Sequence, residues 1–365
     1  MKQISAEIIA DSKNEFGQRI TTFKVVFPRI VLAELNTHRM FSRNSASSRA
    51  IPFKKMVKMV KEDPFIPIAW QKDHSGMQGT EYINSEYALE LTKNTWLKAR
   101  DKAVESAIEL HSETTRCPAV TKQLCNRLLE PFMWHTAIIT ATEYENFFAL
   151  RCPQYESSDG TLFRSRKDIV AYEHEDNEDF TSFTDLDFLT INKSGAEIHI
   201  SRLAECMWDA YNESDPKQLK AGEWHIPYGD EFDTGLLVSA YRLHLHPDGE
   251  LKKKDIDKLK IKIATARCAR VSYKTLGDNP KIDYEADIKL HDRLASMGHW
   301  SPFEHVARCM SYPEYKTSIN GKCDWLGDNT GNLGPVEDDS MLGWSGNLRG
   351  FLQYRKTFDR ENITI

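Results

Sequence analysis

A polar, basic segment over residues 37–49 constrains this chain more than any other feature. It reads Thr-His-Arg-Met-Phe-Ser-Arg-Asn-Ser-Ala-Ser-Ser-Arg, so arginines stand among small hydroxyl and amide side chains. Between Arg29 and Lys61 the only acid is Glu34, although the whole chain has a formal net charge of −6. Arginines and hydroxyls suit phosphate oxygens, which predicts a loop that binds an anionic ligand. A solvated basic face is the alternative, and it better explains the lysines after Pro52.

Length and charge limit the class of protein. A chain of 365 residues can bury a sizeable core. Its acidic balance argues against a protein built to coat nucleic acid. No apolar run approaches the roughly 20 residues needed to cross a bilayer, and residues 1–7 lack the apolar stretch of a secretory signal. We therefore expect neither a membrane nor a nucleic acid as partner.

The cysteines indicate a reducing compartment. There are 7 of them, an odd number, and none forms a C-x-x-C pair. This argues against a disulfide framework and against a zinc site. A cytoplasmic location follows as an expectation.

Hydrophobic periodicity predicts an alternation of strands and helices. We predict strands over 18–28, which would be the first strand, and 135–142. We predict helices over 30–38, 84–112, from Pro118 to about Leu129, 143–151, 196–212, 234–246, 253–268 and 282–297. The buried stripe of the 84–112 helix is expected at Tyr87, Leu91, Trp96, Ala99, Val104, Ala107 and Leu110. Thr142 is expected to cap the 143–151 helix.

The predicted fold class is α+β, with a mixed sheet and long helices. Residues 155–195 are acidic and weakly periodic, and we interpret them as an insertion. They separate a core of residues 1–154, which holds the basic segment, from residues 196–365, which complete the core. The stretch 312–343 is rich in Gly, Asp and Asn and is predicted to be a loop.

The basic segment resembles the signature R-H-R-x-x-S-x-N-x-x-S-x-R of the flavin-dependent (alternative) thymidylate synthases. The positions that match are His38, Arg39, Ser42, Asn44, Ser47 and Arg49, and Thr37 departs from the first arginine. A second stretch, 298–305 (Gly-His-Trp-Ser-Pro-Phe-Glu-His), resembles the family's flavin-binding element G-H-x-[ST]-x-x-E-H, and 269–273 (Ala-Arg-Val-Ser-Tyr) looks like its companion. A metal site at His299, Glu304 and His305 is the competing interpretation, although their spacing is not that of H-E-x-x-H.

Two arginines follow in the order that the family shows. Arg127 precedes Pro131, and Arg151 ends the predicted 143–151 helix, whose last six residues, from Asn146, match the family's N-F-x-x-L-R. By resemblance, Arg151 would contact the pyrimidine ring, where a guanidinium can stabilise developing negative charge. The run 345–356 resembles the family's G-N-x-R helix through Asn347 and Arg349, and it competes with 143–151 for that role.

Motif order is the unexpected feature, because 298–305 follows the signature here and precedes it in ordinary family members. The chain therefore resembles a circularly permuted, large virus-type member. The resemblance implies thymidylate synthesis, with dUMP as substrate, FAD as cofactor, methylenetetrahydrofolate and NADPH as co-substrates, and a homotetramer. Ser47, Arg49 and Arg127 would bind the nucleotide with Arg151 as the catalytic residue. The residues implied for cofactor binding are His38, Arg39, Asn44, Asn146, His299, Ser301, Glu304, Asn347 and Arg349.

Two rival functions stay open. Flavin- and folate-dependent hydroxymethylation of dUMP could use the same site, and Thr37 and Ser45 leave room for it because they depart from the usual family residues. A non-enzymatic nucleic-acid binder could use the basic patch over 29–61, although Phe41 and Phe53 are its only aromatic residues.

Overall fold

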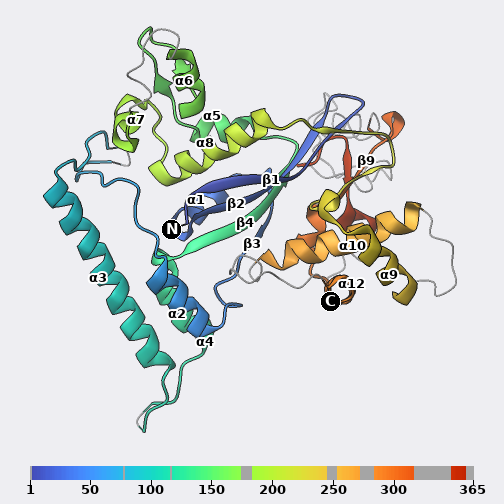
Figure 1. Ribbon diagram of the computed structural model, residues 1–365, viewed down its shortest axis with the longest axis horizontal. Coiled ribbons are helices and arrows are strands. Elements are labelled where there is room, and N and C mark those ends of the chain that lie inside the picture. Colours follow the sequence, from blue (N-terminus) through green and yellow to red (C-terminus); the bar gives the residue numbers. More distant parts are fainter. Residues whose placement is uncertain are drawn as a thin grey trace, which may run out of the picture.

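A five-stranded mixed sheet lies at the centre of the molecule, with helices on both sides (Figure 1). The structure is a computed structural model that describes residues 2–76, 79–115, 117–173, 183–244, 253–271, 283–315 and 347–358. The strands run in the order β3 (Ser42–Ser45), β4 (Trp134–Ala141), β2 (Arg19–Pro28), β1 (Ser5–Asn14) and β7 (Lys217–Leu219). All neighbours are antiparallel except β1 and β7, which are parallel.

The two faces of this sheet differ because successive side chains of a strand point to opposite sides. One face is apolar. Phe23 pairs with Ile139, and both belong to a buried core with residues of the helices that cover this face. These helices are α1 (Leu32–Asn36), α5 (Glu145–Arg151) and α8 (Ile198–Glu213). The hydrophobic effect at this face holds the sheet to its helices.

The other face is polar in its middle. Thr22 pairs with Thr140, which in turn pairs with Ser42, and all three are buried. Parts of the C-terminal half cover them, which makes this face the junction between the two halves of the chain (Figure 1). The elements of this part of the chain are β8 (Trp224–His225), α9 (Thr234–His244), α10 (Lys253–Ala269), α12 (Tyr284–Ser296), η5 (Ser301–Glu304), β9 (Ala307–Cys309), β10 (Phe351–Gln353) and η7 (Tyr354–Thr357), of which α9 and α12 pack on α10.

The long helix α3 (Glu86–His111) stands at one side of the molecule (Figure 1). It packs on α2 (Phe53–Glu62), α4 (Lys122–Cys125) and η2 (Asn126–Phe132). Of the stripe expected to be buried, only Val104 and Ala107 are buried, whereas Tyr87 is 78% and Leu91 is 52% exposed. The prediction of a fully buried stripe was therefore wrong, because the supporting elements reach only one part of the helix.

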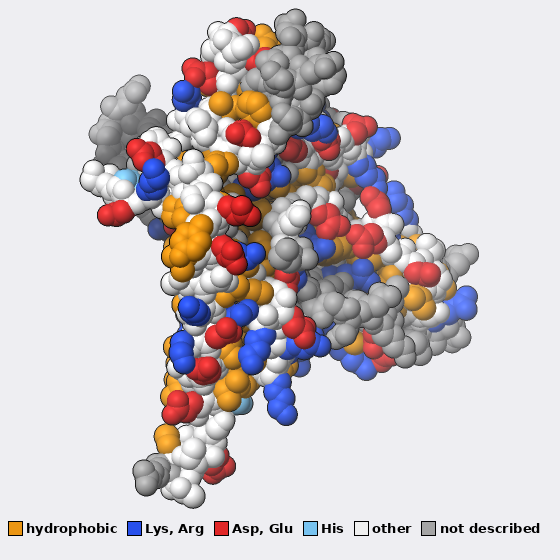
Figure 2. All heavy atoms as spheres, turned by 60° about the vertical axis from the view of Figure 1, so that its left-hand side comes forward, with side chains coloured by type: hydrophobic (Ala, Val, Ile, Leu, Met, Phe, Trp, Pro, Cys, Tyr) orange, Lys and Arg blue, Asp and Glu red, His pale blue; other side chains and the backbone are white. Residues whose placement is uncertain are grey.

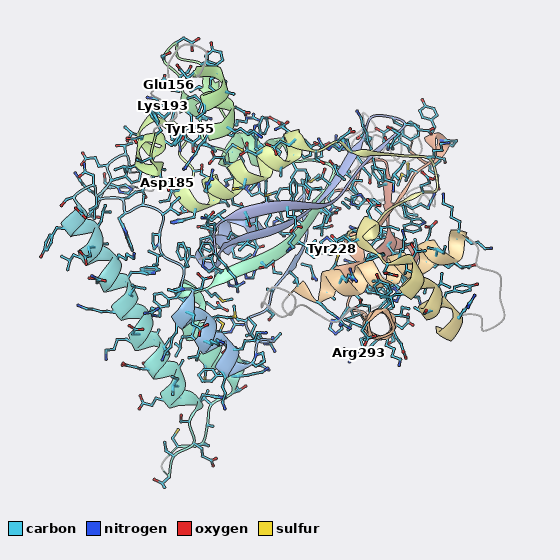
Figure 3. All side chains as sticks on the ribbon, viewed as in Figure 1. Tyr155, Glu156, Asp185, Lys193, Tyr228 and Arg293 are labelled. Atoms are coloured by element: carbon cyan, nitrogen blue, oxygen red, sulfur yellow. The ribbon has the colours of Figure 1, made fainter. Side chains whose placement is uncertain are left out.

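Residues 155–192 contain more regular structure than their weak periodicity indicates. A hairpin of β5 (Tyr155–Glu156) and β6 (Leu162–Phe163) packs with α6 (Arg166–Glu173) and α7 (Asp185–Ile191) around Tyr155, Ile169 and Phe188. Lys193 closes this group through an ion pair of 2.8 Å with Glu156 (Figure 3). The acidic residues at 174–182 lie outside the described residues.

Most predicted elements are present, and four predictions need correction. β1 precedes the expected first strand. β3 is a strand where a loop was expected, because β4 offers it a hydrogen-bonding edge. The helical segment after Pro118 begins only at Lys122, with Thr121 as its cap. Thr142 does not cap α5, whose N-cap is Tyr144. The predicted loop at 312–343 falls largely outside the described residues.

No helix in the described ranges combines the length and hydrophobicity needed to cross a membrane.

Candidate active site

The signature segment contributes the edge strand β3, which presents Ser42 and Asn44 to the polar face of the sheet. The Ser42 hydroxyl accepts hydrogen bonds from the side-chain amides of Asn347, at 2.7 Å, and Gln353, at 3.1 Å. Both amides come from the C-terminal segment, more than three hundred residues away in sequence. The signature is therefore held in place by the far end of the chain.

The second motif is delivered to β3 by the way α12 ends. Gly298 adopts a left-handed conformation with φ of 70°, its N–H binds the Ala295 carbonyl, and the N–H of His299 binds the Leu294 carbonyl. This pair of bonds is a Schellman motif, which glycine favours because it has no Cβ. The turn ends the helix and starts η5 beside β3, so the motif's glycine has a structural role.

Asn44 and Ser301 join the two motifs directly. The Ser301 hydroxyl donates to Asn44 Oδ1 at 3.0 Å, across a sequence separation of 257 residues. Asn44 Nδ2 donates to the Cys268 carbonyl at 2.7 Å, which fixes the orientation of the amide. Asn44 thus uses both ends of its side chain to connect β3 with η5 and α10.

Glu304 contacts an arginine, whereas the metal interpretation would require it to lie beside His299 and His305. Its carboxylate accepts from Arg355 at 2.6 Å, and its negative charge also acts on Arg43, whose pKa is lowered by burial and by Arg39 but raised by Glu304. The other members of the competing metal set point elsewhere, because His305 Nδ1 bonds Thr140 at 2.8 Å and His299 is exposed. Within the described ranges, no three His, Cys, Asp or Glu side chains come together as a metal site. The structure therefore does not bring His299, Glu304 and His305 together.

His38 and Arg151 meet at the start of the signature. Arg151 Nε donates to His38 Nε2 at 3.0 Å, and an amino group of Arg151 lies 3.4 Å from the Thr37 hydroxyl. Burial, Arg151 and Arg43 lower the pKa of His38 to about 4, so the ring is neutral near pH 7 and accepts the bond from Arg151. Threonine at position 37 avoids a further positive charge beside Arg151.

The residues predicted to bind the nucleotide phosphate lie on two neighbouring segments, Ser47 and Arg49 in the turn after β3 and Arg127 on η2. The Ser48 hydroxyl donates to Glu130 at 2.6 Å, and Arg127 lies 3.9 Å from the same carboxylate. Arg49 donates to the neutral Gln123 at 2.9 Å and has no acidic partner among the residues that the structure describes. Ser47, Arg49 and Arg127 are all exposed.

The remaining predicted residues do not form a single cluster. Arg39 and His299 are exposed near the junction, and Asn146 is exposed on α5. Arg349 pairs with Glu143 at 3.1 Å, and its N–H donates to the Thr142 hydroxyl at 2.9 Å. The two segments that compete for one role are therefore neighbours, and 347–358 forms a turn, a short strand and a 3-10 turn, where a helix was expected.

Sequence reasoning missed four residues of this junction. Gln353 and Arg355 position Ser42 and Glu304, Arg43 adds positive charge beside them, and Glu130 offsets the charge of nearby arginines. Arg43 lies inside the basic segment over 37–49, and Gln353 and Arg355 lie in the run that resembles the G-N-x-R element, so their sequence context was a reason to consider these three residues, whereas Glu130 had no such signal.

Comparisons with known proteins identify no family. No family model matches the chain, and no curated protein matches it either. Two solved structures of PolB, described as a UMP/dUMP methylase from Streptomyces cacaoi, are similar to it. The complex with 5-Br UMP has 14% identity and a TM-score of 0.37 and covers 58% of this chain and 90% of that chain. The complex with 5-Br dUMP has 12% identity and a TM-score of 0.38 and covers 58% of this chain and 91% of that chain. Similarity this low assigns neither fold nor activity.

Proposed function

We propose that this chain is a flavin-dependent thymidylate synthase that methylates dUMP reductively at C5. FAD would be its cofactor, with methylenetetrahydrofolate and NADPH as co-substrates and a homotetramer as its assembly. The observation that carries the proposal is the hydrogen bond from Ser301 to Asn44 at 3.0 Å. It brings together two segments that resemble a flavin-binding signature and its partner element despite their reversed order.

The donor set at the junction fits a flavin dinucleotide. Beyond its bond to the Cys268 carbonyl, the Asn44 amide has a second N–H, and the Ser301 hydroxyl that donates to Asn44 can still accept a hydrogen bond, so both side chains have a group that can pair with a carbonyl or nitrogen of a flavin ring. The exposed side chains of Arg39 and His299 suit phosphate oxygens. When bound, FAD would supply the hydride chemistry of a reductive methylation.

The nucleotide would lie across β3 between two groups of residues. We propose that Ser47, Arg49 and Arg127 bind its phosphate, because all three are exposed and η2, which holds Arg127, is bonded to the turn that holds Ser47 and Arg49. Arg49 suits this role best, since its side-chain partner is the neutral Gln123. Arg151 would then face the uracil ring, where its charge stabilises the negative charge that develops as C5 becomes nucleophilic.

Hydroxymethylation of dUMP is a second candidate, and one observation favours it. A hydroxyl, that of Thr37, lies 3.4 Å from Arg151 where the family signature has an arginine. This makes the surroundings of Arg151 less positive and gives them a group that can bind water.

The mass of the nucleotide product tests the proposal. We expect the purified protein, supplied with FAD, NADPH, methylenetetrahydrofolate and dUMP, to form dTMP. A product one oxygen atom heavier would support hydroxymethylation instead. Unchanged dUMP, in a protein that is folded and saturated with FAD, would contradict both functions. A reaction without the folate controls for the origin of the added carbon.

A further inference from the structure

A buried chain of hydrogen bonds crosses the polar face of the sheet. Ser12 Oγ bonds Nδ1 of His225 at 2.9 Å, and Nε2 of the same ring bonds the Thr22 hydroxyl at 2.8 Å. Thr22 bonds Thr140 at 2.7 Å, and Thr140 bonds Nδ1 of His305 at 2.8 Å. The five side chains come from four separate parts of the sequence, and all are buried.

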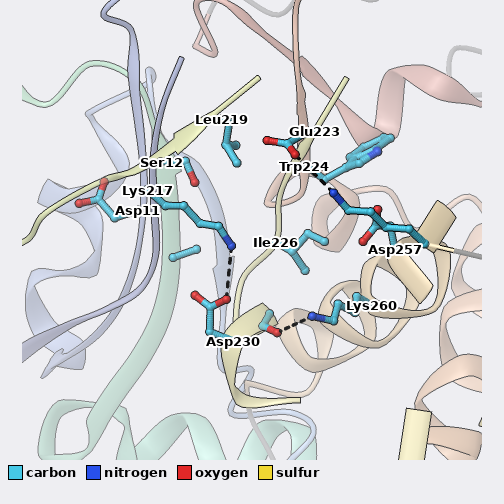
Figure 4. A pocket seen from close by; sticks show the side chains of 13 residues that line it. Asp11, Ser12, Lys217, Leu219, Glu223, Trp224, Ile226, Asp230, Asp257 and Lys260 are labelled. Carbon is cyan, nitrogen blue, oxygen red and sulfur yellow. Dashed lines mark hydrogen bonds and ion pairs between the residues drawn. The ribbon is translucent and has the colours of Figure 1, made fainter. Parts of the chain in front are cut away.

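The two ends of this hydrogen-bond chain, Ser12 and His305, lie in different surroundings. Ser12 lines a cleft of about 230 Å³ between the β1 and β7 edge and α10 (Figure 4). At the other end, Nε2 of His305 is buried and has no hydrogen-bond partner in the described part of the structure. His305 directly follows Glu304, and Thr140, which holds its ring, pairs with Ser42 of the candidate site. The hydrogen-bond chain therefore runs from the cleft to a buried ring nitrogen beside residues of the candidate site.

The number of protons shows that all hydrogen bonds of this series must point the same way. Each hydroxyl and each neutral imidazole has one transferable proton, so five protons serve four hydrogen bonds. If no buried hydroxyl proton is left without an acceptor, the spare proton sits at one end. It is either on Ser12 Oγ, pointing to the cleft, or on Nε2 of His305. Both rings must then have the same tautomer, with the proton on Nδ1 in the first state and on Nε2 in the second.

Burial keeps both rings neutral. It lowers the pKa of His225 to about 4 and that of His305 to about 3. A positive charge on either ring is costly because it cannot be solvated there. A proton can therefore pass along the chain only if all links shift together. Because a buried N–H without an acceptor is avoided more strongly than an unpaired acceptor, we expect the first state, with Nε2 of His305 as a vacant acceptor.

We propose that Ser12, His225, Thr22, Thr140 and His305 form a proton relay between the candidate active site and solvent in the cleft. A proton leaves a bound molecule and forms an N–H bond at Nε2 of His305, while the electron pair of the broken bond stays on that molecule. In the same event, His305 passes its Nδ1 proton to Thr140, Thr140 passes one to Thr22, and Thr22 passes one to His225 Nε2. His225 passes its Nδ1 proton to Ser12, and Ser12 releases its own proton to water. Each residue keeps one proton and no buried charge forms.

Under the proposed function, on which this part rests, the proton would be the one that uracil C5 loses when it is methylated. His305 would then act as a base whose capacity depends on groups as distant as Ser12. A polar network that only stabilises the fold has no such dependence.

The first test needs no activity. Nitrogen NMR of the wild-type protein, with the His225 and His305 signals assigned by H225Q and H305Q, reports which nitrogen of each ring has the proton. We expect both rings as the Nδ1–H tautomer at pH 7. Different tautomers in the two rings, or a charged ring, would overturn the relay.

The second test uses paired variants in the full chain loaded with FAD. Thr22→Val and Thr140→Val remove a link at nearly constant volume, whereas Thr22→Ser and Thr140→Ser keep the hydroxyl. Thr136→Val is the matched control, because Thr136 is a buried threonine of β4 that takes no part in the proposed relay. We expect turnover of dUMP to fall at least about tenfold in the valine variants and to be retained in the serine variants and the control, with dUMP binding unchanged.

Equal turnover in valine and serine variants would overturn the relay. If the wild-type protein binds FAD but does not modify dUMP, the proposed function fails, and the tautomers of His225 and His305 alone decide on the relay.

Discussion

At the scale of single residues, Arg151 is the side chain on which the proposed chemistry depends most. Its guanidinium lies against the neutral His38 ring and the Thr37 hydroxyl, so no carboxylate neutralises it through these contacts. An arginine positioned in this way keeps its full charge for a ligand. The neighbouring Arg349 differs, because its charge is shared with Glu143.

Replacing Arg151 by alanine should lower turnover of dUMP far more than it lowers dUMP affinity, because the contact strengthens as charge develops in the transition state. It should also raise the pKa of His38 above its value of about 4, since a nearby positive charge is removed. Steady-state kinetics and an NMR titration of His38 measure the two effects. Retained turnover, together with its loss in Arg349→Ala, would assign the catalytic role to Arg349.

Neither Cys152 nor Cys125 should act as a nucleophile. Burial raises the pKa of the Cys152 thiol well above its usual range, so the reactive thiolate is not formed near neutral pH. Cys125 is fully buried as well. We expect Cys152→Ser and Cys125→Ser to keep most product formation, at a cost of about 1–3 kcal/mol in stability for a buried hydroxyl. Loss of product with folding, FAD content and dUMP binding intact would indicate covalent catalysis.

The sequence predicts some of these residues better than others. Asn44, Ser301 and Arg151 stand in motifs with fixed spacing, and each makes a specific contact in the structure. Asn146 is exposed, and its side chain makes no such contact with the residues that the structure describes. Glu130 could not be predicted from spacing, because its position among Arg29, Ser48 and Arg127 is created by packing of η2 against the turn after β3.

At the scale of elements, α3 shows how a periodic pattern can mislead. Its N-terminal turns present Tyr87 and Leu91 to solvent, and Ile108 and Leu110 near the other end are 40% and 43% exposed. Figure 2 brings this side forward and shows hydrophobic side chains between charged ones. Helical spacing predicts the helix itself, but it does not predict how far neighbouring elements cover it.

This difference along α3 can be measured with two substitutions. Val104→Ala should destabilise the protein by about 2 kcal/mol, since Val104 is 1% exposed and its truncation leaves a cavity. Leu91→Ala should change the free energy of unfolding by no more than about 0.5 kcal/mol, because the side chain is already largely solvated. Urea unfolding monitored by circular dichroism measures both. Equal losses would mean that Leu91 is covered in solution.

β3 is the converse case, a strand that its own residues do not predict. Ser42, Arg43, Asn44 and Ser45 have neither β-branched nor aromatic side chains, which normally indicate a strand. The segment becomes a strand because β4 supplies a hydrogen-bonding partner along its length. Long-range pairing of this kind can be seen only once the sheet is assembled.

At the scale of the whole molecule, segments that are distant in sequence contact each other across the polar face of the sheet. The N-terminal half supplies β3, and the C-terminal half supplies Ser301, Asn347, Gln353 and Arg355. Gly350 illustrates how closely they fit, because it has φ of 75° and a Cβ there would lie 2.4 Å from the Asn14 amide. The reversed motif order could be read from the sequence, but the contact between the motifs could not.

Buried histidines should make the folded state sensitive to mild acid. The pKa of His38 and His225 is about 4 and that of His135 and His305 is about 3. The unfolded chain, with histidine pKa values near 6.5, therefore takes up protons that the folded chain does not. Their contribution to stability is full above about pH 6.5 and is lost as the pH falls toward 4, by up to about 1.4 kcal/mol per pH unit for each ring.

Guanidinium unfolding at pH 7, 6 and 5 measures this effect. We expect the midpoint to fall steeply over the series, and a His135→Gln variant to show a shallower fall. A midpoint independent of pH across this range would show that the rings are not held neutral in the folded state.

If β3 and residues 298–305 form one flavin site, as we propose, they should determine how tightly the protein binds FAD. Titration of the purified chain with FAD, followed by flavin fluorescence, should show binding in the wild type. Asn44→Ala and Ser301→Ala should each weaken it roughly fivefold to tenfold, as expected for a lost hydrogen bond of about 1 kcal/mol. Ser296→Ala, an exposed serine at the end of α12, should bind as the wild type does. A wild-type chain that does not bind FAD, or variants that bind it as tightly as Ser296→Ala, would contradict the account.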